Sequence, residues 1–308
     1  EYYSNETSSF ASGISKINLF VSSGANRFKF KAGAAAVYGF GDDFIEKSLF
    51  LFPLLDLSYK PKKGNLTPFL KVSGDFNQNS FRSFSDENPF VAPAIILKNT
   101  EVPYAVELGT RTKLVSGWEF TMNAYYQKAN NAPFFRSFGY DNSNEQFIAF
   151  RYGNSFEVIY GELEQFGFDT SVLAAFKNGG SLSLQAHWRD YSVEQTEAWN
   201  MPELQFDFKA NIKIFNKIFI QPNIIFIGAR KNSYRERFLI QNPQDAPLIE
   251  ADLPSFVNAE VKVTFQLTDR WELYVKGENI FNTPEFRWVN YQVYGARFLS
   301  GVRYNFDL

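Results

Sequence analysis

Catalytic chemistry in this sequence would have to centre on His187, the only histidine, which lies in the segment Gln185-Ala186-His187-Trp188-Arg189. Hydrolases pair a histidine with a nucleophile or a carboxylate, but no serine or aspartate stands at such a motif spacing here. Zinc sites draw on histidine and cysteine, and the chain has no cysteine. We therefore interpret His187 as a polar lining side chain. We expect no catalytic residue, no metal site, no cofactor and no enzyme activity.

Charged residues of both signs form a second candidate group, because they alternate with apolar residues along many segments. Inside a closed sheet such charges could set the selectivity of a pore. They could also neutralise one another and hold the shape of a polar lumen, and the interleaving of the two signs favours this interpretation. The candidate lumen-lining residues are Glu107, Arg111, Lys113, His187, Asp207, Lys209, Glu260, Lys262, Lys276, Arg297 and Arg303.

Aromatic residues among acids and amides form a third group, in segments that we expect to be loops. Aromatic surfaces suit sugar or peptide ligands, and they also suit the docking of a partner protein. Loops that pack on one another, or an aromatic girdle at a membrane surface, would give the same pattern. The candidates for ligand or partner binding are Phe134, Phe135, Phe138, Tyr140, Phe286, Trp288 and Tyr291.

Residues 203–215 show which elements carry these side chains. Every second residue is apolar, beginning at Leu204 and Phe206, and the residues between them, such as Asp207 and Lys209, are polar. Successive side chains of a strand point to opposite faces, so this segment has one apolar face and one charged face. The pattern recurs through most of the chain and predicts β-strands.

We predict thirteen strands in this way. Several carry an apolar set over about ten residues or more, the length that a tilted strand needs to cross a bilayer. The odd count indicates a merged pair within 156–177 or 78–101, or a chain that begins part-way through a longer barrel. The predicted ranges are 13–22, 27–40, 49–59, 67–77, 102–114, 118–128, 156–177, 180–191, 203–215, 218–230, 256–268, 271–281 and 293–306.

Short and long connections alternate strictly along the chain. The short ones, such as Pro61–Asn65 and Asn178–Gly180, carry the Gly, Asn and Pro of tight turns. Bacterial outer-membrane barrels have short periplasmic turns and long external loops, whereas a soluble β-sandwich has no reason to sort its connections by rim. The long connections are 78–101, 129–155, 192–202, 231–255 and 282–292, with 41–48 somewhat shorter.

Composition agrees with a barrel and excludes other classes. Aromatic residues make up 18% of the 308 residues, and they favour strands and membrane interfaces. The mean hydropathy is only -0.27, and the longest apolar run, Leu49–Leu55, is interrupted by Pro53, so a helical membrane protein is excluded. The net charge of -2 comes without a basic run, and we expect no nucleic-acid partner.

The end of the chain resembles the barrel of TonB-dependent receptors. Residues 275–282, Val-Lys-Gly-Glu-Asn-Ile-Phe-Asn, are similar to the penultimate strand of that family, and residues 294–306 resemble its last strand, closing on Phe306. Residues 102–109 followed by Ser116-Gly117-Trp118 are similar to an internal hairpin of the same barrels. Two features depart from the family: Asp307 and Leu308 follow Phe306, and nothing resembles its plug. The family's barrels have about 22 strands, more than this chain holds.

We therefore expect an all-β chain that forms a transmembrane antiparallel up-and-down β-barrel with about 13–14 strands. Residues 1–308 would be a single barrel domain and the C-terminal part of a longer chain, in which residues 1–12 end an external loop. The resemblance implies the outer membrane of a Gram-negative bacterium. The implied partners are the bilayer, lipopolysaccharide, and the barrel-assembly machinery through the strand ending at Phe306. A further implied partner is a TonB-type energy transducer, or other outer-membrane proteins and lipoproteins.

Two main hypotheses for function remain open at this stage. The first is the uptake of a solute across the outer membrane, which the C-terminal signature favours. The second is a plugless barrel that serves as a structural or accessory subunit of a larger outer-membrane complex, which the lack of a plug-like segment favours. A third hypothesis, an outer-membrane hydrolase, would require His187.

Overall fold

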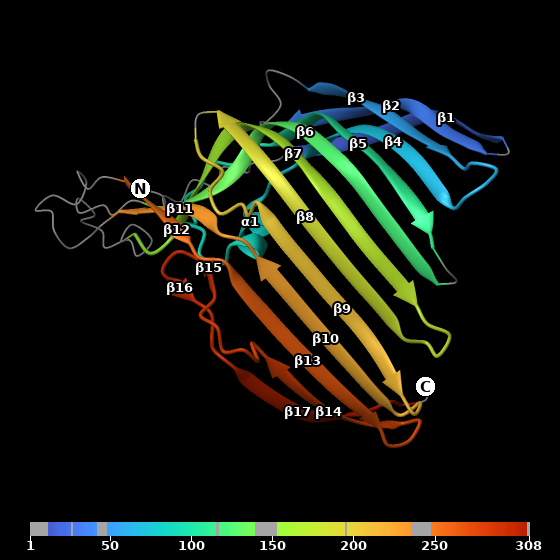
Figure 1. The fold of residues 1–308 in the computed structure, drawn as a ribbon. Coiled ribbons are helices and arrows are strands. Elements are labelled where there is room, and N and C mark those ends of the chain that lie inside the picture. The colour runs from blue at the N-terminus through green and yellow to red at the C-terminus, as the bar shows by residue number, and fades with distance from the viewer. Residues whose placement is uncertain are drawn as a thin grey trace, which may run out of the picture.

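A computed structural model describes residues 12–25, 27–41, 48–114, 117–138, 153–194, 196–235 and 248–306. Its main element is one antiparallel sheet of 13 strands in which neighbours in the sheet follow one another in the chain (Figure 1). The strands are β1 (Ser12–Ala25), β2 (Phe28–Gly41), β3 (Leu49–Tyr59), β4 (Leu66–Asn77), β5 (Thr100–Lys113), β6 (Trp118–Ser137), β7 (Phe156–Ala175), β8 (Ser181–Glu194), β9 (Leu204–Ile214), β10 (Ile218–Ile227), β13 (Phe256–Gln266), β14 (Trp271–Glu278) and β17 (Arg297–Tyr304).

The remaining elements gather at the end of the sheet where the long connections lie (Figure 1). They are one short helix and two small ribbons, each of two antiparallel strands. The short turns lie at the opposite end. The helix is α1 (Phe81–Glu87), and the ribbons are β11 (Arg230–Arg235) with β12 (Leu248–Leu253) and β15 (Phe286–Trp288) with β16 (Tyr291–Gln292).

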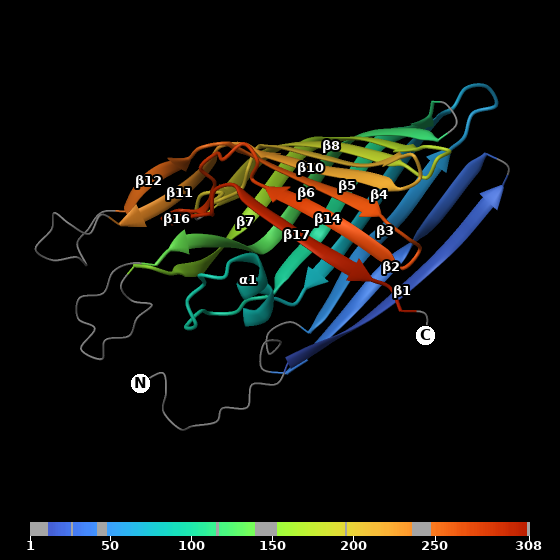
Figure 2. The same ribbon diagram turned by 90° about the horizontal axis from the view of Figure 1, so that it is seen from below.

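The sheet curves into a trough with β1 and β17 at its two edges (Figures 1 and 2). Pairing among the described residues runs without a break from β1 to β17, and does not join these two strands to each other. The register is regular over most of the sheet, so odd and even residues of a strand keep to opposite faces.

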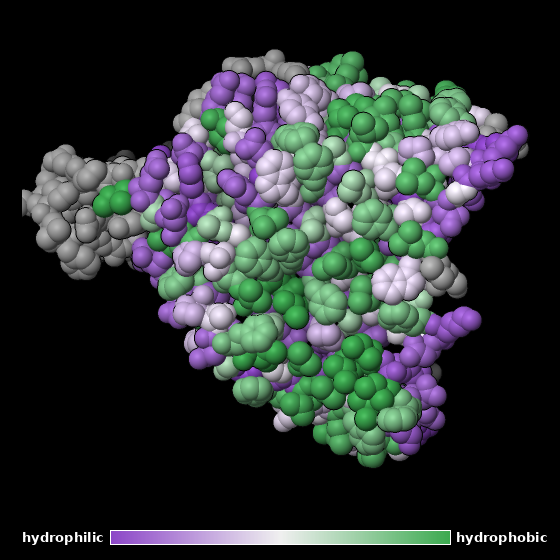
Figure 3. All heavy atoms as spheres, in the orientation of Figure 1, coloured by the Kyte–Doolittle hydropathy of each residue, from purple (hydrophilic) through white to green (hydrophobic). Residues whose placement is uncertain are grey.

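Large apolar side chains cover the convex face, which is the face turned to the viewer in Figure 3. Hydrophobic residues predominate over the body of the strands, and hydrophilic residues gather toward both ends (Figure 3). The side chain of Leu108, for example, is 60% exposed. No helix in the described ranges is both long and apolar enough to cross a membrane. Other exposed apolar residues of this face are Leu51, Met122, Phe166, Phe168, Leu184, Phe206, Ile212, Val263 and Val275.

The thirteen predicted strands are confirmed, with ends that differ by a few residues in most cases. The proposal of a merged pair is wrong, because β7 is a single strand and the range 78–101 holds α1. The largest difference is β6, which continues to Ser137 where a loop is predicted. A bulge between Ala129 and Ala132 changes the alternation there, and a one-residue bulge hides a strand from a period-2 pattern.

Candidate functional site

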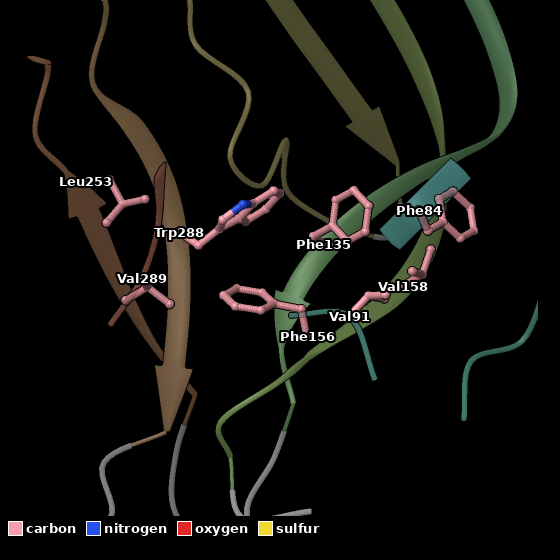
Figure 4. Packing of buried hydrophobic residues seen from close by; sticks show 8 residues of the cluster. All are labelled: Phe84, Val91, Phe135, Phe156, Val158, Leu253, Trp288 and Val289. Carbon is pink, nitrogen blue, oxygen red and sulfur yellow. The ribbon is translucent and has the colours of Figure 1, made fainter. Parts of the chain in front are cut away.

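The long-loop end carries a hydrophobic core of its own, which we call the aromatic cap. Side chains from α1, β6, β7, β12 and β15 meet in it (Figure 4). The rings of Phe135 and Trp288 lie 5.2 Å apart edge to face, and those of Phe156 and Trp288 lie 5.3 Å apart. Trp288 is only 7% exposed and Phe156 only 1%. The cap consists of Phe84, Val91, Phe135, Phe156, Val158, Leu253, Trp288 and Val289.

Ring stacking and hydrogen bonds from neighbouring segments hold the cap against the sheet. The ring of Tyr291 stacks on Phe90 with centroids 3.5 Å apart, and the Tyr291 hydroxyl donates to the carbonyl of Asn154. The backbone N–H of Phe156 donates to the Phe90 carbonyl over 2.9 Å, and the N–H of Ala92 donates to the Phe156 carbonyl over 2.8 Å. The connection after α1 is therefore held against the beginning of β7.

The seven predicted loop aromatics do not form one exposed surface. Phe134 and Phe135 lie in β6, so their assignment to a loop is wrong. Phe135 and Trp288 pack in the cap, and Phe286 and Tyr291 pack against it. This burial agrees with the interpretation of loops that pack on one another.

The other predicted aromatics lie elsewhere. Phe134 is buried in a second cluster with Trp199 and Leu163. The backbone N–H of Phe138, just after β6, donates to the Ser155 carbonyl over 2.8 Å. Tyr140 lies outside the described residues.

A pocket of about 380 Å³ lies beside Trp288, between the cap and the concave side of the sheet. Ile225, Ile227 and Phe256 give it apolar walls, and its polar lining includes Arg230 and Asn258. A mostly apolar pocket with a few polar groups is the common form of a small-molecule site. We call this the Arg230 pocket.

Arg230 is the central polar group of this pocket and is only 6% exposed. Its Nη1 donates to the side-chain oxygen of Asn200 over 3.2 Å and to the carbonyl of Arg287 over 3.1 Å, and its Nη2 donates to the Phe286 carbonyl over 2.5 Å. Its Nε has no hydrogen-bond partner among the described residues. Burial lowers the pKa of Arg230, because a low-dielectric surrounding disfavours the charged form.

A buried carboxylate contacts two residues of the pocket lining, Asn258 and Arg287. Glu285 is 1% exposed, accepts a bond from Arg287 Nε over 2.6 Å and accepts another from Asn258 Nδ2 over 2.8 Å. The side-chain oxygen of Asn258 is buried without a partner in the described part of the chain. Arg230 Nε and the Asn258 side-chain oxygen are thus two buried polar atoms without a partner among the described residues, and such groups are costly.

Most predicted lumen-lining residues lie on the concave side in ion pairs. Lys71 Nζ lies 3.1 Å from Glu107, and Arg111 Nε lies 3.2 Å from Glu119. At the other edge of the sheet, Lys276 lies between Glu260 and Glu278, Arg297 pairs with Glu278, and Arg303 with Glu272. This agrees with the interpretation of mutually neutralising charges.

His187 belongs to the same kind of network. Its Nδ1 lies 2.7 Å from Asp169 Oδ1, and Arg189 Nη2 lies 2.6 Å from the same carboxylate oxygen. Asn123 Nδ2 donates to the other oxygen of Asp169 over 3.2 Å. The carboxylate is thus shared by three side chains, which suits a lining network.

The remaining lining candidates have other surroundings. Asp207 accepts a bond from Gln205 over 2.7 Å, and the Lys262 ammonium lies 4.9 Å from the centroid of the Tyr274 ring. Within the described ranges, Lys113 and Lys209 form no ion pair.

No family model and no curated protein matches the sequence, but solved structures do match. The ferripyoverdine receptor of the outer membrane of Pseudomonas aeruginosa superposes with a TM-score of 0.67 at 12% identity, over 96% of this chain and 39% of that one. The ferric-catecholate import receptor Fiu of Escherichia coli K12 superposes with a TM-score of 0.64 at 10% identity, over 96% of this chain and 45% of that one. The siderophore receptor PirA of Acinetobacter baumannii superposes with a TM-score of 0.63 at 13% identity, over 96% of this chain and 45% of that one.

The fold is that of a TonB-dependent receptor barrel. The chain spans less than half the length of each of these receptors. All three are named as receptors, and the first is placed in the outer membrane by its name.

The C-terminal signature that carried the resemblance has a structural reason. Asn279 and Asn282 both adopt left-handed backbone angles, with φ of 45° and 51°, a region that asparagine tolerates better than most residues. The Asn279 amide donates to the carbonyls of Thr283 and Tyr294, and its oxygen accepts from the Thr283 N–H. Asn282 accepts from the Ala296 N–H over 3.0 Å. These two side chains hold the connection between β14 and β17 in place.

Sequence reasoning missed the charged residues in and beside the pocket. Arg230 ends a predicted strand, and Glu285 lies in a predicted loop, so neither had a pattern to mark it. Phe84 and Phe156 of the cap were also missed. The one available signal was the density of aromatics in long connections, which indicates that such loops have something to bury.

Proposed function

We propose that this chain forms the wall of an outer-membrane receptor that takes up a solute, with the aromatic cap and the Arg230 pocket at the external end. One observation carries the proposal: a sheet with an apolar convex face and a charged concave face superposes, over 96% of the chain, with a ferripyoverdine receptor and a ferric-catecholate import receptor. An apolar band facing lipid and a polar interior are what a membrane barrel requires.

In this proposal the pocket is the first place where a solute is held. Arg230 and Asn258 give its lining polar groups, and Phe256 and Trp288 offer apolar contact area. The cap fixes these groups in position, because Trp288 belongs to both the cap and the pocket wall. A rigid, partly apolar site loses little entropy when it binds a ligand.

A sheet that crosses the outer membrane in this way would meet different partners on its convex face and at its short-turn end. The convex face would contact lipid and, in the outer leaflet, lipopolysaccharide. A TonB-type energy transducer would act from the short-turn side, and the barrel-assembly machinery would recognise the strand that ends near Phe306. No described residue and no comparison favours the other hypothesis, an accessory subunit of a larger complex.

Uptake in cells that lack the protein tests the proposal. We expect a complemented strain to accumulate at least one labelled ferric siderophore or copper, the solutes named for the structural neighbours, and a protonophore to stop this uptake. Arg230→Met should lower uptake without lowering the amount of protein in the outer membrane. Arg82→Met, at an exposed position on α1, is the matched control and should have no effect.

Two results would overturn the proposal. The first is a protein that fractionates away from the outer membrane. The second is equal accumulation of every solute with and without the protein.

A further inference from the structure

On the concave face of β2–β5, residues that lie side by side on neighbouring strands form rows across the sheet. In one of these rows the charges are balanced. Lys31 lies opposite Asp56, Asp56 opposite Lys71, and Lys71 opposite Glu107. Opposite charges alternate across four neighbouring strands, which is the favourable arrangement for cross-strand pairs. This part of the wall carries no excess charge.

The balance is lost in the next rows toward the short turns. Lys29 lies opposite Ser58, and Ser58 opposite Phe69, so this row has a cation and no acid. In the row below, the Lys60 N–H donates to the Arg27 carbonyl over 2.8 Å, and Arg111 lies opposite Thr67. Positive charge therefore accumulates at the short-turn end of these four strands.

These side chains line a groove of about 460 Å³, which we call the basic groove. Its lining contains one carboxylate, Asp56, and Phe69 forms part of its wall. The Lys71 ammonium lies 5.3 Å from the centroid of the Phe69 ring, and the Arg111 guanidinium lies 5.8 Å from it. The cations of the lining are Arg27, Lys29, Lys60, Lys71, Arg111 and Lys113.

Only two of these six cations have an anionic partner in the described part of the chain. Lys71 pairs with Glu107 and Arg111 with Glu119. The other four, Arg27, Lys29, Lys60 and Lys113, form no ion pair with a described residue.

The two strands at the opposite edge of the sheet, β14 and β17, are balanced by comparison. There Lys276, Arg297 and Arg303 each have a carboxylate within 3.4 Å. Clustered like charges repel one another and attract a partner of opposite sign. A counter-charge from outside the described residues is therefore expected at the basic groove and at no comparable place on the opposite edge.

We propose that the basic groove docks an acidic polypeptide segment that enters the concave side from the short-turn end. The unpaired cations come from the turn before β2 (Arg27), the beginning of β2 (Lys29), the turn after β3 (Lys60) and the end of β5 (Lys113). They are therefore spread along the short-turn rim and suit carboxylates spaced along a chain. Ser58, Asn65 and Thr67 lie among the cations and can bond to the peptide groups of such a segment.

Binding of a labelled peptide to the whole chain in detergent micelles tests the proposal. The probe is a short peptide of alternating Asp and Ser, and the matched peptide replaces each Asp with Asn. We expect the acidic peptide to bind, the Asn peptide not to bind, and the affinity to fall as salt rises, since salt screens exposed charges.

Variants locate the site. The triple variant Lys29→Gln, Lys60→Gln, Lys113→Gln should bind the acidic peptide about tenfold more weakly, from three exposed ion pairs of ordinary strength. The control triple Lys209→Gln, Lys213→Gln, Lys262→Gln removes the same charge from another part of the concave wall and should bind as the parent does. Since all six side chains are at least partly exposed, both variants should keep the folded, heat-modifiable band of the parent.

Three outcomes would overturn the proposal. Equal binding of the Asn peptide would remove the role of charge, and equal loss in both triple variants would remove the groove as the site. Competition by pyrophosphate at the same concentration as the acidic peptide would show a site for small anions rather than for a polypeptide.

Discussion

Phe156 and Phe168 lie in the same strand, β7, and on the same parity, yet one is 1% exposed and the other 47%. The pairing of β7 with β8 is regular from Glu162 to Ala175, and the bulge opposite Gly161–Leu163 lies in β6. What differs is the cover: α1, β12 and β15 fold over Phe156 in the aromatic cap, whereas no described segment covers Phe168. One strand therefore serves two surroundings. The long-loop end of β7 packs against other segments of the chain, as in the core of a soluble protein. The middle of the strand exposes apolar side chains, which need an apolar cover from outside the chain.

Replacing the two phenylalanines tests this contrast most strongly. Phe156→Ala should destabilise the cap by about 3–5 kcal/mol, because it removes a fully buried ring. Phe168→Ala should cost about 0.5 kcal/mol in a bilayer, since a lipid-facing Phe contributes little. Rates of limited proteolysis at the long-loop end measure the cap directly. Equal rates in the two variants would contradict the contrast.

A charge on the convex face gives the next largest effect. Leu184 and Gln185 are neighbours in β8 that point to opposite faces, and Gln185 lies opposite Asp207. Leu184→Arg should cost about 2–4 kcal/mol in a bilayer, while an arginine at the polar neighbour should be tolerated. Folding yield into lipid vesicles is the measurement, with Gln185→Arg as the control. A Leu184→Arg protein that folds as well as this control would show that the convex face does not meet lipid.

The connection after β14 gives a smaller effect that does not depend on lipid. Asn279→Ala should cost about 2 kcal/mol, because its side chain makes three hydrogen bonds to the backbone. Asn290 has a similar φ of 67° but is exposed, so Asn290→Ala should cost about 1 kcal/mol of backbone strain alone. Urea unfolding in the same detergent compares them. A larger cost at Asn290 would contradict the role given to the Asn279 amide.

Ion pairs of the concave wall should have the smallest effect. The Lys71–Glu107 pair is partly exposed on both sides, and such pairs contribute below about 1 kcal/mol. A double-mutant cycle with Lys71→Gln and Glu107→Gln measures the coupling. A coupling of several kcal/mol would mean that the wall is as tightly packed as the cap.

The strands could be predicted because their signal is local. Alternation along β9, from Leu204 to Ile214, follows directly from a sheet with one apolar and one polar face. The alternation of short and long connections predicted which strand ends lie together at each end of the sheet. The Asn279–Asn282 signature predicted where β14 ends. All of these depend on residues that are close in the sequence.

The site could not be predicted because its contacts are distant in sequence. Arg230 bonds to the carbonyls of Phe286 and Arg287, more than fifty residues away. Phe156 meets Trp288 across the whole second half of the chain. The bulge at Ala129 hid the extension of β6, and with it the fact that Phe134 and Phe135 point to opposite clusters.

The accessibility of single cysteines in intact cells shows where each part of the sheet lies, because the chain has no cysteine of its own to react. Three positions suffice: Ile96→Cys at the long-loop end, Lys62→Cys in a short turn, and Leu108→Cys in the middle of the convex face. With a membrane-impermeant maleimide, we expect Ile96→Cys to react at once, Lys62→Cys to react only after the outer membrane is opened, and Leu108→Cys to react only after unfolding. Equal reaction of all three in intact protein would contradict a sheet that crosses a membrane.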